Sequence, residues 1–345
     1  MPTTRMMANQ SGSVHPMDLQ RCIGELEGPI FVVGAGGFIG INLFNRIFAH
    51  RRDVYAVTKD AQQNWRMNVN RVPRKNIVSC DINEVTLLKH VIDEYRPRTI
   101  LNLAAYGAYS KQREYGKIHL TNFNSTINFI EALKETGFSA YVHAGSSSEY
   151  GTNASAPTED SPLHPNSHYA VSKVACFHAI RYYGVVEGLP VAHLRLYSAY
   201  GPWEEPDRLV PVLVSKARGK AYPRFVQREV SRDFVHVSDV CNAFLLAAGN
   251  ISRVRGDVFN IGSGIKTTIG ELAELVAREF GIQEDPVFSG LPNRDWDILD
   301  WYSDSSKARD VLGWKAEIEL GHGLVQVGEW QREVDYDNAY WNFNR

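Results

Sequence analysis

A tyrosine and a lysine four residues apart are the first pair in this sequence with the chemistry of a catalytic acid and base. Tyr169 and Lys173 stand in the run Tyr-Ala-Val-Ser-Lys, and on a helix such a pair lies on one face. The ammonium group favours the phenolate form of the tyrosine. Such a tyrosine can take a proton from an alcohol as hydride leaves, or give one to a carbonyl as hydride arrives. The same spacing also occurs on helices without catalytic roles, so the catalytic interpretation of this pair depends on other motifs in the sequence.

A glycine-rich turn provides the strongest of these signals. Residues 29–33 form a short apolar run, and Gly34, Gly37 and Gly40 follow it directly, before an amphipathic segment. In such a turn the first glycine permits the tight bend and the second the approach of a pyrophosphate. The third permits close packing of helix on strand. The N–H groups at the helix start attract the phosphate charge. A strand before the turn and a helix after it predict dinucleotide binding.

A cluster of hydroxyl groups precedes the tyrosine. Residues 141–151 read as a strand that ends in Ser146, Ser147 and Ser148. One serine at this strand end can hydrogen-bond the reacting oxygen while Tyr169 handles its proton. A serine-rich turn without function is the alternative interpretation.

Strand and helix signals alternate along the first two thirds of the chain. Strands are predicted at 30–33, 53–58, 77–80, 99–103, 140–143 and 191–196, and helices at 39–50, 85–94, 117–136 and 168–187. This alternation predicts the α/β class and a Rossmann-type doubly wound parallel sheet. Two later strands, at 234–237 and 257–261, are expected to return to the same sheet.

The pattern also predicts how the chain is divided. Residues 1–28 form an N-terminal extension and residues 29–196 the dinucleotide-binding domain. Residues 197–232 and 263–345 form a smaller C-terminal substrate-binding lobe over the carboxyl edge of the sheet. Most tryptophans of this lobe are expected in its core, with one free to stack on a nucleotide base: Trp296, Trp301, Trp314 and Trp330.

Bulk composition limits the possible partners and compartments. The 345 residues carry a net charge of −2, so no nucleic-acid partner and no membrane surface are expected. The four cysteines and eleven histidines lack metal-ligand spacing, so no metal site is expected. The N-terminus does not resemble a signal peptide, and no run approaches the ~20 apolar residues of a membrane span. A cytoplasmic enzyme is therefore expected.

Taken together, these motifs resemble the extended short-chain dehydrogenase/reductase family, which includes NAD-dependent epimerases, dehydratases and reductases of nucleotide sugars. The resemblance runs from about residue 29 to residue 330. Beyond the glycine turn, the serine turn and the Tyr169/Lys173 pair, it rests on residues 81–82, 102–105, 122, 194–202, 232–237 and 260–264.

The resemblance implies a role for each matching residue. The catalytic set is Ser146, Tyr169 and Lys173, and Lys173 also holds the nicotinamide ribose. Cofactor contacts come from Gly34, Gly37, Phe38, Ile39, Gly40, Asp81, Ile82, Leu103, Ala104, Ala105 and Asn122. Substrate contacts come from Ser147, Ser198, Arg208 and Arg232. An arginine suits a diphosphate because its planar fork donates two parallel hydrogen bonds, although a solvated surface charge is the alternative.

The second strand bears on the choice of cofactor. In the family this strand often ends in an aspartate that holds the ribose hydroxyls, but here Thr58 and Lys59 stand at the end. A hydroxyl and a cation suit a 2′-phosphate, which a carboxylate would repel. NADP(H) is therefore favoured, and Asp60 keeps NAD(H) possible.

The serine turn bears on the reaction. Dehydratases of the family carry Asp-Glu, or a lone Glu, two and three places before the tyrosine that matches Tyr150, where this chain has Ser147 and Ser148. Glu149 stands one place late and is expected to point elsewhere. Reduction of a 4-keto-6-deoxy sugar nucleotide, in polysaccharide synthesis, is therefore favoured. The alternative is an NDP-sugar 4-epimerase with tightly bound NAD. A 4,6-dehydratase and a non-catalytic dinucleotide-binding regulator are less favoured.

The helix predicted at 168–187 bears on assembly. Val174, Phe177, Ile180 and Tyr183 suggest a second, exposed apolar face. In the family this face packs between subunits, which implies a homodimer. A core within one chain is the alternative interpretation.

Overall fold

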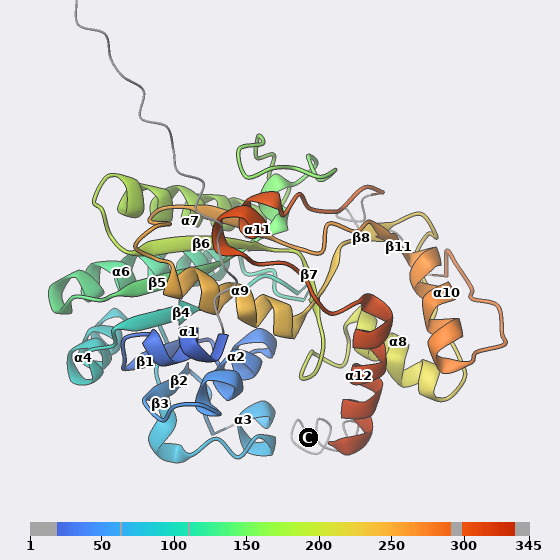
Figure 1. Ribbon diagram of the computed structural model, residues 1–345, viewed down its shortest axis with the longest axis horizontal. Helices are drawn as coiled ribbons and strands as arrows, with labels where there is room; N and C mark the ends of the chain where they lie inside the picture. The colour runs from blue at the N-terminus through green and yellow to red at the C-terminus, as the bar shows by residue number, and fades with distance from the viewer. Residues whose placement is uncertain (1–18, 63, 110, 291–298, 335–345) are drawn as a thin grey trace, which may run out of the picture.

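A seven-stranded parallel sheet lies at the centre of the computed structural model, which describes residues 19–62, 64–109, 111–290 and 299–334 (Figure 1). Its strands are β1 Ile30–Val33, β2 Val54–Thr58, β3 Ile77–Ser79, β4 Thr99–Asn102, β5 Ala140–Ser146, β6 Val191–Leu196 and β10 Val258–Ile261. They lie side by side in the order β10-β6-β5-β4-β1-β2-β3. The order reverses direction at β1 and β4, which is where ligands bind in doubly wound sheets. The predicted fold class is confirmed.

Helices cover both faces of this sheet. On one face lie α2 (Phe38–Phe48) and α9 (Val237–Gly249), flanked by α1 (Leu19–Glu25) and α11 (Ser306–Leu312). On the other lie α4 (Val85–Tyr95), α6 (Ser125–Thr136) and α7 (His168–Val185). Along β1, Ile30 and Val32 enter one core and Phe31 and Val33 the other. Burial on both sides explains why this strand is continuously apolar.

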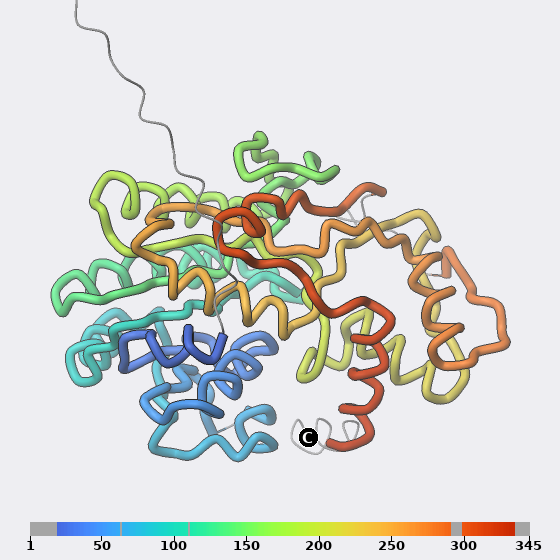
Figure 2. The backbone as a smooth tube through the Cα atoms, viewed as in Figure 1, coloured from blue at the N-terminus to red at the C-terminus, as the bar shows by residue number. Residues whose placement is uncertain are grey.

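A second group of elements lies beside the sheet, at the right of Figures 1 and 2. It contains α8 (Leu209–Arg218), α10 (Ile269–Phe280) and α12 (Leu320–Glu333), together with an antiparallel pair, β8 (Ser231–Arg232) and β11 (Thr267–Thr268). These elements enclose a core of their own, in which Leu213, Phe225 and Leu272 are buried. Two further short helices, α3 (Trp65–Val69) and α5 (Tyr115–His119), follow β2 and β4. No described helix is long and apolar enough to cross a bilayer.

The strand predicted at 234–237 does not join the main sheet, whereas the one predicted at 257–261 does, as β10. Residues Phe234–His236 form β9, which pairs in parallel with β7 (Ser198–Tyr200) in a separate two-stranded sheet. The cause is that the chain leaves the main sheet after β6. The N–H of Ser198 donates to the carbonyl of Asp233 at 2.9 Å, which starts the new pairing. The helix α9, which begins at Val237, was not predicted.

The apolar face predicted to be exposed on α7 is largely internal. Phe177, Ile180 and Tyr183 are all buried within the chain, and Val174 is half-buried. Ile180 and Tyr183 pack in the core between the sheet and α4, α6 and α7. The prediction of an exposed face at these residues is therefore wrong, and the alternative of a core within one chain is correct.

Candidate active site

The turn between β1 and α2 has the geometry that a dinucleotide cradle requires. Gly34 has φ +79°, in the left-handed region that favours glycine. At Gly40, an added Cβ would lie 2.3 Å from the carbonyl oxygen of Gly34. Gly37 caps α2, so the N–H groups of Phe38 and Ile39 in its first turn have no helical acceptor. Bare backbone and unbonded donors fit a pyrophosphate group.

The end of β2 holds the residues predicted to meet the adenosine ribose. Thr58 is buried next to the glycine turn, and a Cβ on Gly36 would lie 2.8 Å from its hydroxyl oxygen. Lys59 is exposed, and its ammonium lies 3.8 Å from the carboxylate of Asp60. The side-chain amide of Asn64 donates to the carbonyl of Gly36 at 3.0 Å. A hydroxyl, a cation and one carboxylate therefore stand at this strand end.

Arg66 adds a link that sequence reasoning missed. Its Nε donates to the carbonyl of Trp203 at 2.7 Å, and its Nη1 donates to the carbonyl of Gly36 at 3.3 Å. Its Nη2 lies 2.9 Å from the carboxylate of Glu205. Arg66 thus joins the loop after β7 to the glycine turn. Nothing local in the sequence predicts contacts across more than a hundred residues.

The residues predicted to run along the cofactor follow the next strand ends. Asp81 and Ile82 follow β3, and Leu103, Ala104 and Ala105 follow β4. The N–H of Ala104 donates to the side chain of Asn102 at 3.1 Å, and the N–H of Leu103 donates to the Val33 carbonyl, just before the glycine turn, at 2.9 Å. A Cβ on Gly34 would lie 2.8 Å from the Ala104 nitrogen. The strand ends therefore gather these residues at one edge of the sheet.

Asn122 is fully buried in a π-helical segment, Leu120–Asn124, that joins α5 to α6. Its amide oxygen accepts the N–H of Tyr106 at 2.8 Å, and its amide nitrogen donates to the Tyr106 carbonyl at 2.9 Å. The same nitrogen donates to the Ser172 hydroxyl at 2.8 Å. Such π segments often mark functional sites. Asn122 fixes the loop after β4 to α7, and its direct contact with a cofactor stays a prediction.

Tyr169 and Lys173 lie on the first turns of α7, whose N-terminus is capped by the Ser167 hydroxyl. Lys173 is 1% exposed, and its Nζ donates to the carbonyl of Ala144 at 2.7 Å. The same Nζ lies 5.7 Å from the centroid of the Tyr169 ring. In the described parts of the chain no carboxylate pairs with Lys173. An uncompensated positive charge therefore lies beside the tyrosine.

Ser146 ends β5 and caps the short 3₁₀ turn Ser147–Tyr150. Its hydroxyl oxygen accepts the N–H of Ser148 at 3.2 Å and lies 2.5 Å from the Ser148 hydroxyl oxygen. One of the two hydroxyl protons lies between these oxygens, so the other can be donated to a substrate. Ala144, which holds Lys173, is two residues away. Lys173 therefore contacts the strand that ends at Ser146, and Tyr169 lies beside Lys173.

Glu149 points away from the acid position of a dehydratase, as predicted, and into the protein interior. It is fully buried, and its Oε2 accepts the Nε–H of Arg195 at 2.7 Å. Its Oε1 lies 2.9 Å from the N–H of Ser146, which it accepts, and 2.8 Å from Nε2 of His193. Burial opposes ionisation of this carboxyl, but His193 and Arg195 override it and hold its pKa below the usual value. The turn at 146–148 consequently offers only hydroxyl groups.

Trp301 reaches this turn from the second group of elements. Its indole Nε1–H donates to the Ser147 hydroxyl at 3.1 Å, and the Arg232 guanidinium lies 5.3 Å from its ring centroid. Trp314 and Trp330 are core residues, as expected, and Trp296 lies outside the described residues. The contact of Trp301 with Ser147 was not predicted; the sequence only placed Trp301 among the four tryptophans of the C-terminal lobe.

Asp233 is a buried hub next to Arg232, and sequence reasoning missed it. Its carboxylate accepts hydrogen bonds from the N–H groups of Ser263, Gly264 and Ser303 and from the hydroxyls of Ser263 and Ser303. These contacts fasten the loop after β10 and the segment before α11 to the end of β8. The only sequence feature that points to Asp233 is its place directly after Arg232.

The remaining predicted substrate residues lie on separate elements. Ser198 begins β7, and Arg208 precedes α8 with its side chain 47% exposed. The Arg208 guanidinium lies 5.4 Å from the centroid of the Tyr109 ring, and its Nε lies 3.7 Å from the Glu204 carboxylate. Burial raises the pKa of Glu204 to about 8. These contacts do not connect Arg208 to Arg232, so its part in substrate binding stays a prediction.

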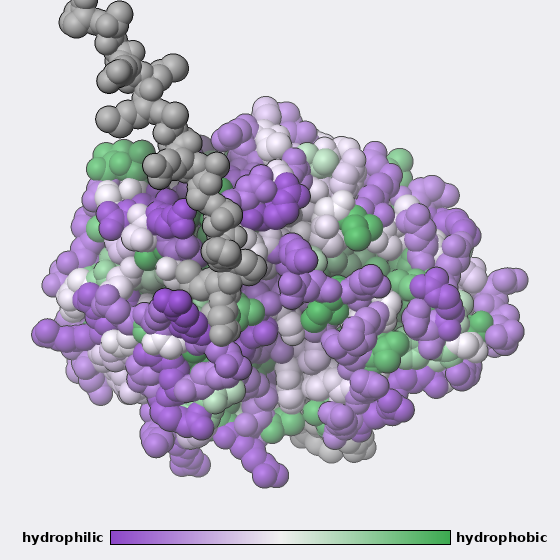
Figure 3. Space-filling view, in the orientation of Figure 1, coloured by the Kyte–Doolittle hydropathy of each residue, from purple (hydrophilic) through white to green (hydrophobic). Residues whose placement is uncertain are grey.

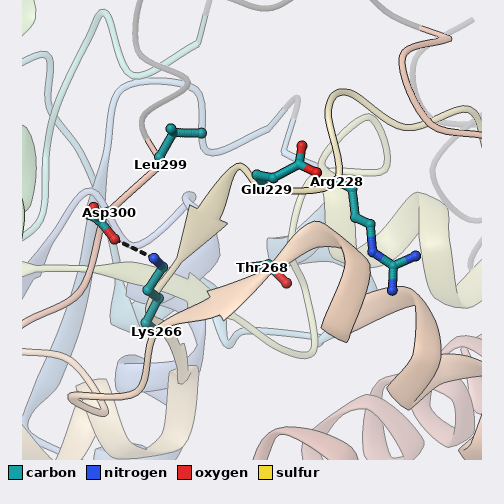
Figure 4. Close-up of a pocket in the computed structure, with 6 residues that line it drawn as sticks. All are labelled: Arg228, Glu229, Lys266, Thr268, Leu299 and Asp300. Atoms are coloured by element: carbon teal, nitrogen blue, oxygen red, sulfur yellow. Dashed lines mark hydrogen bonds and ion pairs between the residues drawn. The ribbon is translucent and has the colours of Figure 1, made fainter.

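A pocket of about 400 Å³ lies next to the β8–β11 pair (Figure 4). Its lining is Arg228, Glu229, Lys266, Thr268, Leu299 and Asp300. In the figure Lys266 meets Asp300 as an ion pair, while Arg228 lies on the opposite side of Thr268. This pocket adjoins the strand that carries Arg232, and it is lined by residues other than those predicted to be catalytic.

Comparison with known proteins bears on the site. Residues 30–262 match the model of the NAD dependent epimerase/dehydratase family. The chain is 31% identical over 311 residues to a UDP-glucose 4-epimerase of Mycolicibacterium smegmatis, a match that covers 87% of this chain and 97% of that protein.

Solved structures agree with this match. A UDP-glucose 4-epimerase of Thermotoga maritima with UDP-glucose superposes with a TM-score of 0.77 at 26% identity, over 88% of this chain and 98% of that one. A dTDP-glucose 4,6-dehydratase of Bacillus anthracis in complex with NAD superposes with a TM-score of 0.73 at 25% identity, over 88% and 96% of the two chains.

Replacing Gly40 tests the cradle. In Gly40→Ala the new Cβ must move the glycine turn or α2, because it would otherwise lie 2.3 Å from the Gly34 oxygen. We expect at least about a tenfold loss of affinity for pyridine dinucleotides, measured by fluorescence titration. The control is Gly24→Ala on α1, where a Cβ has nothing within 4 Å. Equal affinities of the two variants would contradict the assignment of the cradle.

Proposed function

The chain belongs to the NAD dependent epimerase/dehydratase family, and we propose that it is a cytoplasmic enzyme that reduces a 4-keto-6-deoxy sugar nucleotide with NADP(H). One observation carries the choice of reaction. Glu149 is turned inward to Arg195, so the strand end beside Tyr169 presents hydroxyl groups where a dehydratase needs an acid pair. Hydride transfer with proton transfer is the chemistry that remains.

The protein groups act on the carbonyl oxygen of the substrate. The glycine turn, with Gly34, Gly37 and Gly40, would hold the pyrophosphate of a reduced dinucleotide, which would supply the hydride. The hydroxyl pair of Ser146 and Ser148 donates a hydrogen bond to the oxygen and orients it. Tyr169 gives its proton to the same oxygen, and the ammonium of Lys173 stabilises the phenolate that remains. Burial of Lys173 strengthens this effect, since water screens the charge less.

The substrate is expected to lie between the serine turn and the proposed substrate-binding lobe, formed by residues 197–232 and from 263 onward. Arg232 suits the diphosphate, and its guanidinium is held over the Trp301 ring. Trp301 and Ser147 form the wall beside the sugar. Ser198 and Arg208 are proposed to complete the contacts with the nucleotide.

A 4-epimerase with tightly bound NAD is the second candidate. It needs the same serine, tyrosine and lysine, and the Mycolicibacterium relative is named a UDP-glucose 4-epimerase. The two reactions differ in cofactor use, since an epimerase returns the hydride and a reductase consumes it.

Turnover of the purified protein tests the function. With an NDP-4-keto-6-deoxy sugar and NADPH, we expect stoichiometric loss of NADPH. We expect Tyr169→Phe to lower kcat by about 10² to 10⁴, because the proton donor is lost. Tyr183→Phe is the control, because it removes a hydroxyl from the same helix that contacts Glu131. Conversion of an NDP-sugar without added cofactor would favour the epimerase.

The end of β2 supports the preference for NADP(H). Thr58 and Lys59 are proposed to bind a 2′-phosphate, although Asp60 lies 3.8 Å from the Lys59 ammonium. In Thr58→Asp a carboxylate would repel this phosphate and accept hydrogen bonds from ribose hydroxyls. We expect the ratio of kcat/KM for NADPH to that for NADH to fall at least about tenfold, in steady-state assays with each cofactor. An unchanged ratio would place the 2′-phosphate elsewhere.

A second copy of the chain is proposed to cover the outer side of α7. Side chains exposed there or just after its end include Val171, Tyr182, Val185 and Val186, at 44% to 68%. A hydrophobic patch appears over the end of α7 at the upper left of Figure 3. Adjacent exposed apolar side chains favour association.

Charge placed on this surface tests the dimer. We expect the wild type to sediment as a dimer and the double variant Tyr182→Glu/Val186→Glu as a monomer, because a buried carboxylate would lack a partner. Leu87→Glu on α4, also at an exposed apolar side chain, is the control and should leave the sedimentation coefficient unchanged. A monomeric wild type would refute the assembly.

A further inference from the structure

A row of buried polar side chains lies behind the catalytic residues and has no part in the mechanism above. His143 on β5 and His193 on β6 are fully buried neighbours. Their Nδ1 atoms lie 3.1 Å apart, and Nε2 of His193 lies 2.8 Å from Oε1 of Glu149. The row therefore runs from Glu149 through His193 to His143.

The row is closely packed at Gly145. A Cβ there would lie 2.1 Å from Nε2 of His193 and 2.7 Å from Oε1 of Glu149. The absence of a side chain at this position is thus required for the contact between the carboxylate and the imidazole. Arg195 holds the other carboxylate oxygen, so the carboxylate cannot turn away.

Hydrogen-bond chemistry fixes where the protons lie along this row. A carboxylate only accepts, so Nε2 of His193 must carry the proton that it donates to Glu149. Burial lowers the pKa of His193, and burial together with the charge of Lys173 lowers the pKa of His143 well below the usual value, so both rings are neutral. Nδ1 of His193 is then an acceptor and Nδ1 of His143 its donor. Consequently Nε2 of His143 carries no proton.

His143 lies close to Lys173, since the Lys173 Nζ donates to the carbonyl of the next residue, Ala144, and its charge acts on the His143 ring. His143 and His193 project from the face of the sheet covered by α7, where Phe177 packs against the His193 ring at 5.9 Å. Among the described residues Nε2 of His143 has no hydrogen-bond partner. The Lys173 ammonium uses one of its three protons on Ala144. A neutral acceptor near an ammonium attracts it without cancelling its charge.

We propose that His143 is a positioning residue for Lys173, and that Glu149, acting through His193, selects the tautomer in which His143 offers an acceptor to the ammonium group. The opposite tautomer would turn an N–H toward the ammonium and repel it. The inference rests on the proposed function, in which Lys173 assists Tyr169.

Two matched asparagine variants test the role of the nitrogen. His143→Asn keeps a donor for Nδ1 of His193 and removes only the Nε2 end. His236→Asn is the control, because His236 is also buried with an unpartnered Nε2, and its Nδ1 accepts the Ser238 N–H. We expect kcat to fall about tenfold or more in His143→Asn, with KM for the sugar nucleotide within about twofold of wild type. In His236→Asn both constants should stay unchanged.

Nitrogen-15 NMR of the histidines tests the tautomers without turnover. In the wild type we expect His143 to be protonated at Nδ1 only and His193 at Nε2 only. In Glu149→Gln we expect His193 to lose this fixed state, because the amide cannot accept from both Arg195 and the imidazole. A proton on Nε2 of His143, or equal kcat values for the two asparagine variants, would overturn the proposal. A wild type that reduces no keto sugar nucleotide would overturn the proposed function. The NMR spectra would then still test the predicted tautomers of His143 and His193.

Discussion

The hydrogen bond from the Lys173 ammonium to the carbonyl of Ala144 is the contact on which the site depends. Burying an ammonium is unfavourable by several kcal/mol, and a carboxylate partner would offset this at the expense of its field. Here the nearby buried carboxylate, Glu149, is held by Arg195 instead. The protein thus keeps two charge systems apart within one strand end. The Glu149 carboxylate is paired with Arg195 and held in place, and the Lys173 ammonium remains available to Tyr169.

The order of strands explains how residues so far apart in the sequence reach this point. In a parallel sheet all carboxyl ends lie at one edge, so the glycine turn after β1 and the serine turn at the end of β5 share that edge with the loops after β2 and β4. The helix α7 then sets Tyr169 beside them. Contacts such as those of Arg66 with Trp203 and Glu205 fasten this edge to the loop after β7, and Trp301 contacts Ser147.

Local patterns predicted the parts of the structure that local physics determines. Strands such as β1 are buried on both faces and appear as apolar runs, and the glycine turn needs no distant partner to bend. The errors concern pairing and exposure. Residues 234–236 form a strand, but the choice of β7 as its partner depends on where the chain leaves β6. Ile180 and Tyr183 look like an outer face until α6 is placed against them.

In the candidate site, too, features set by local sequence were predictable and contacts between distant residues were not. Tyr169 and Lys173 were identifiable as candidates because of their spacing on one helix, and the serines because they end a predicted strand. That Glu149 points away from the acid position was predictable from its place in the turn, but its burial and its partners His193 and Arg195 were not, since they lie on another strand. The neighbours β6 and β10 are in register, yet residues 197–257 separate them in the sequence. The entropic penalty for closing such an excursion grows only with the logarithm of its length. Insertions and rearrangements inside it are therefore tolerated energetically, and evolution can reshape what the enzyme recognises while the chemical machinery at the sheet edge stays constant.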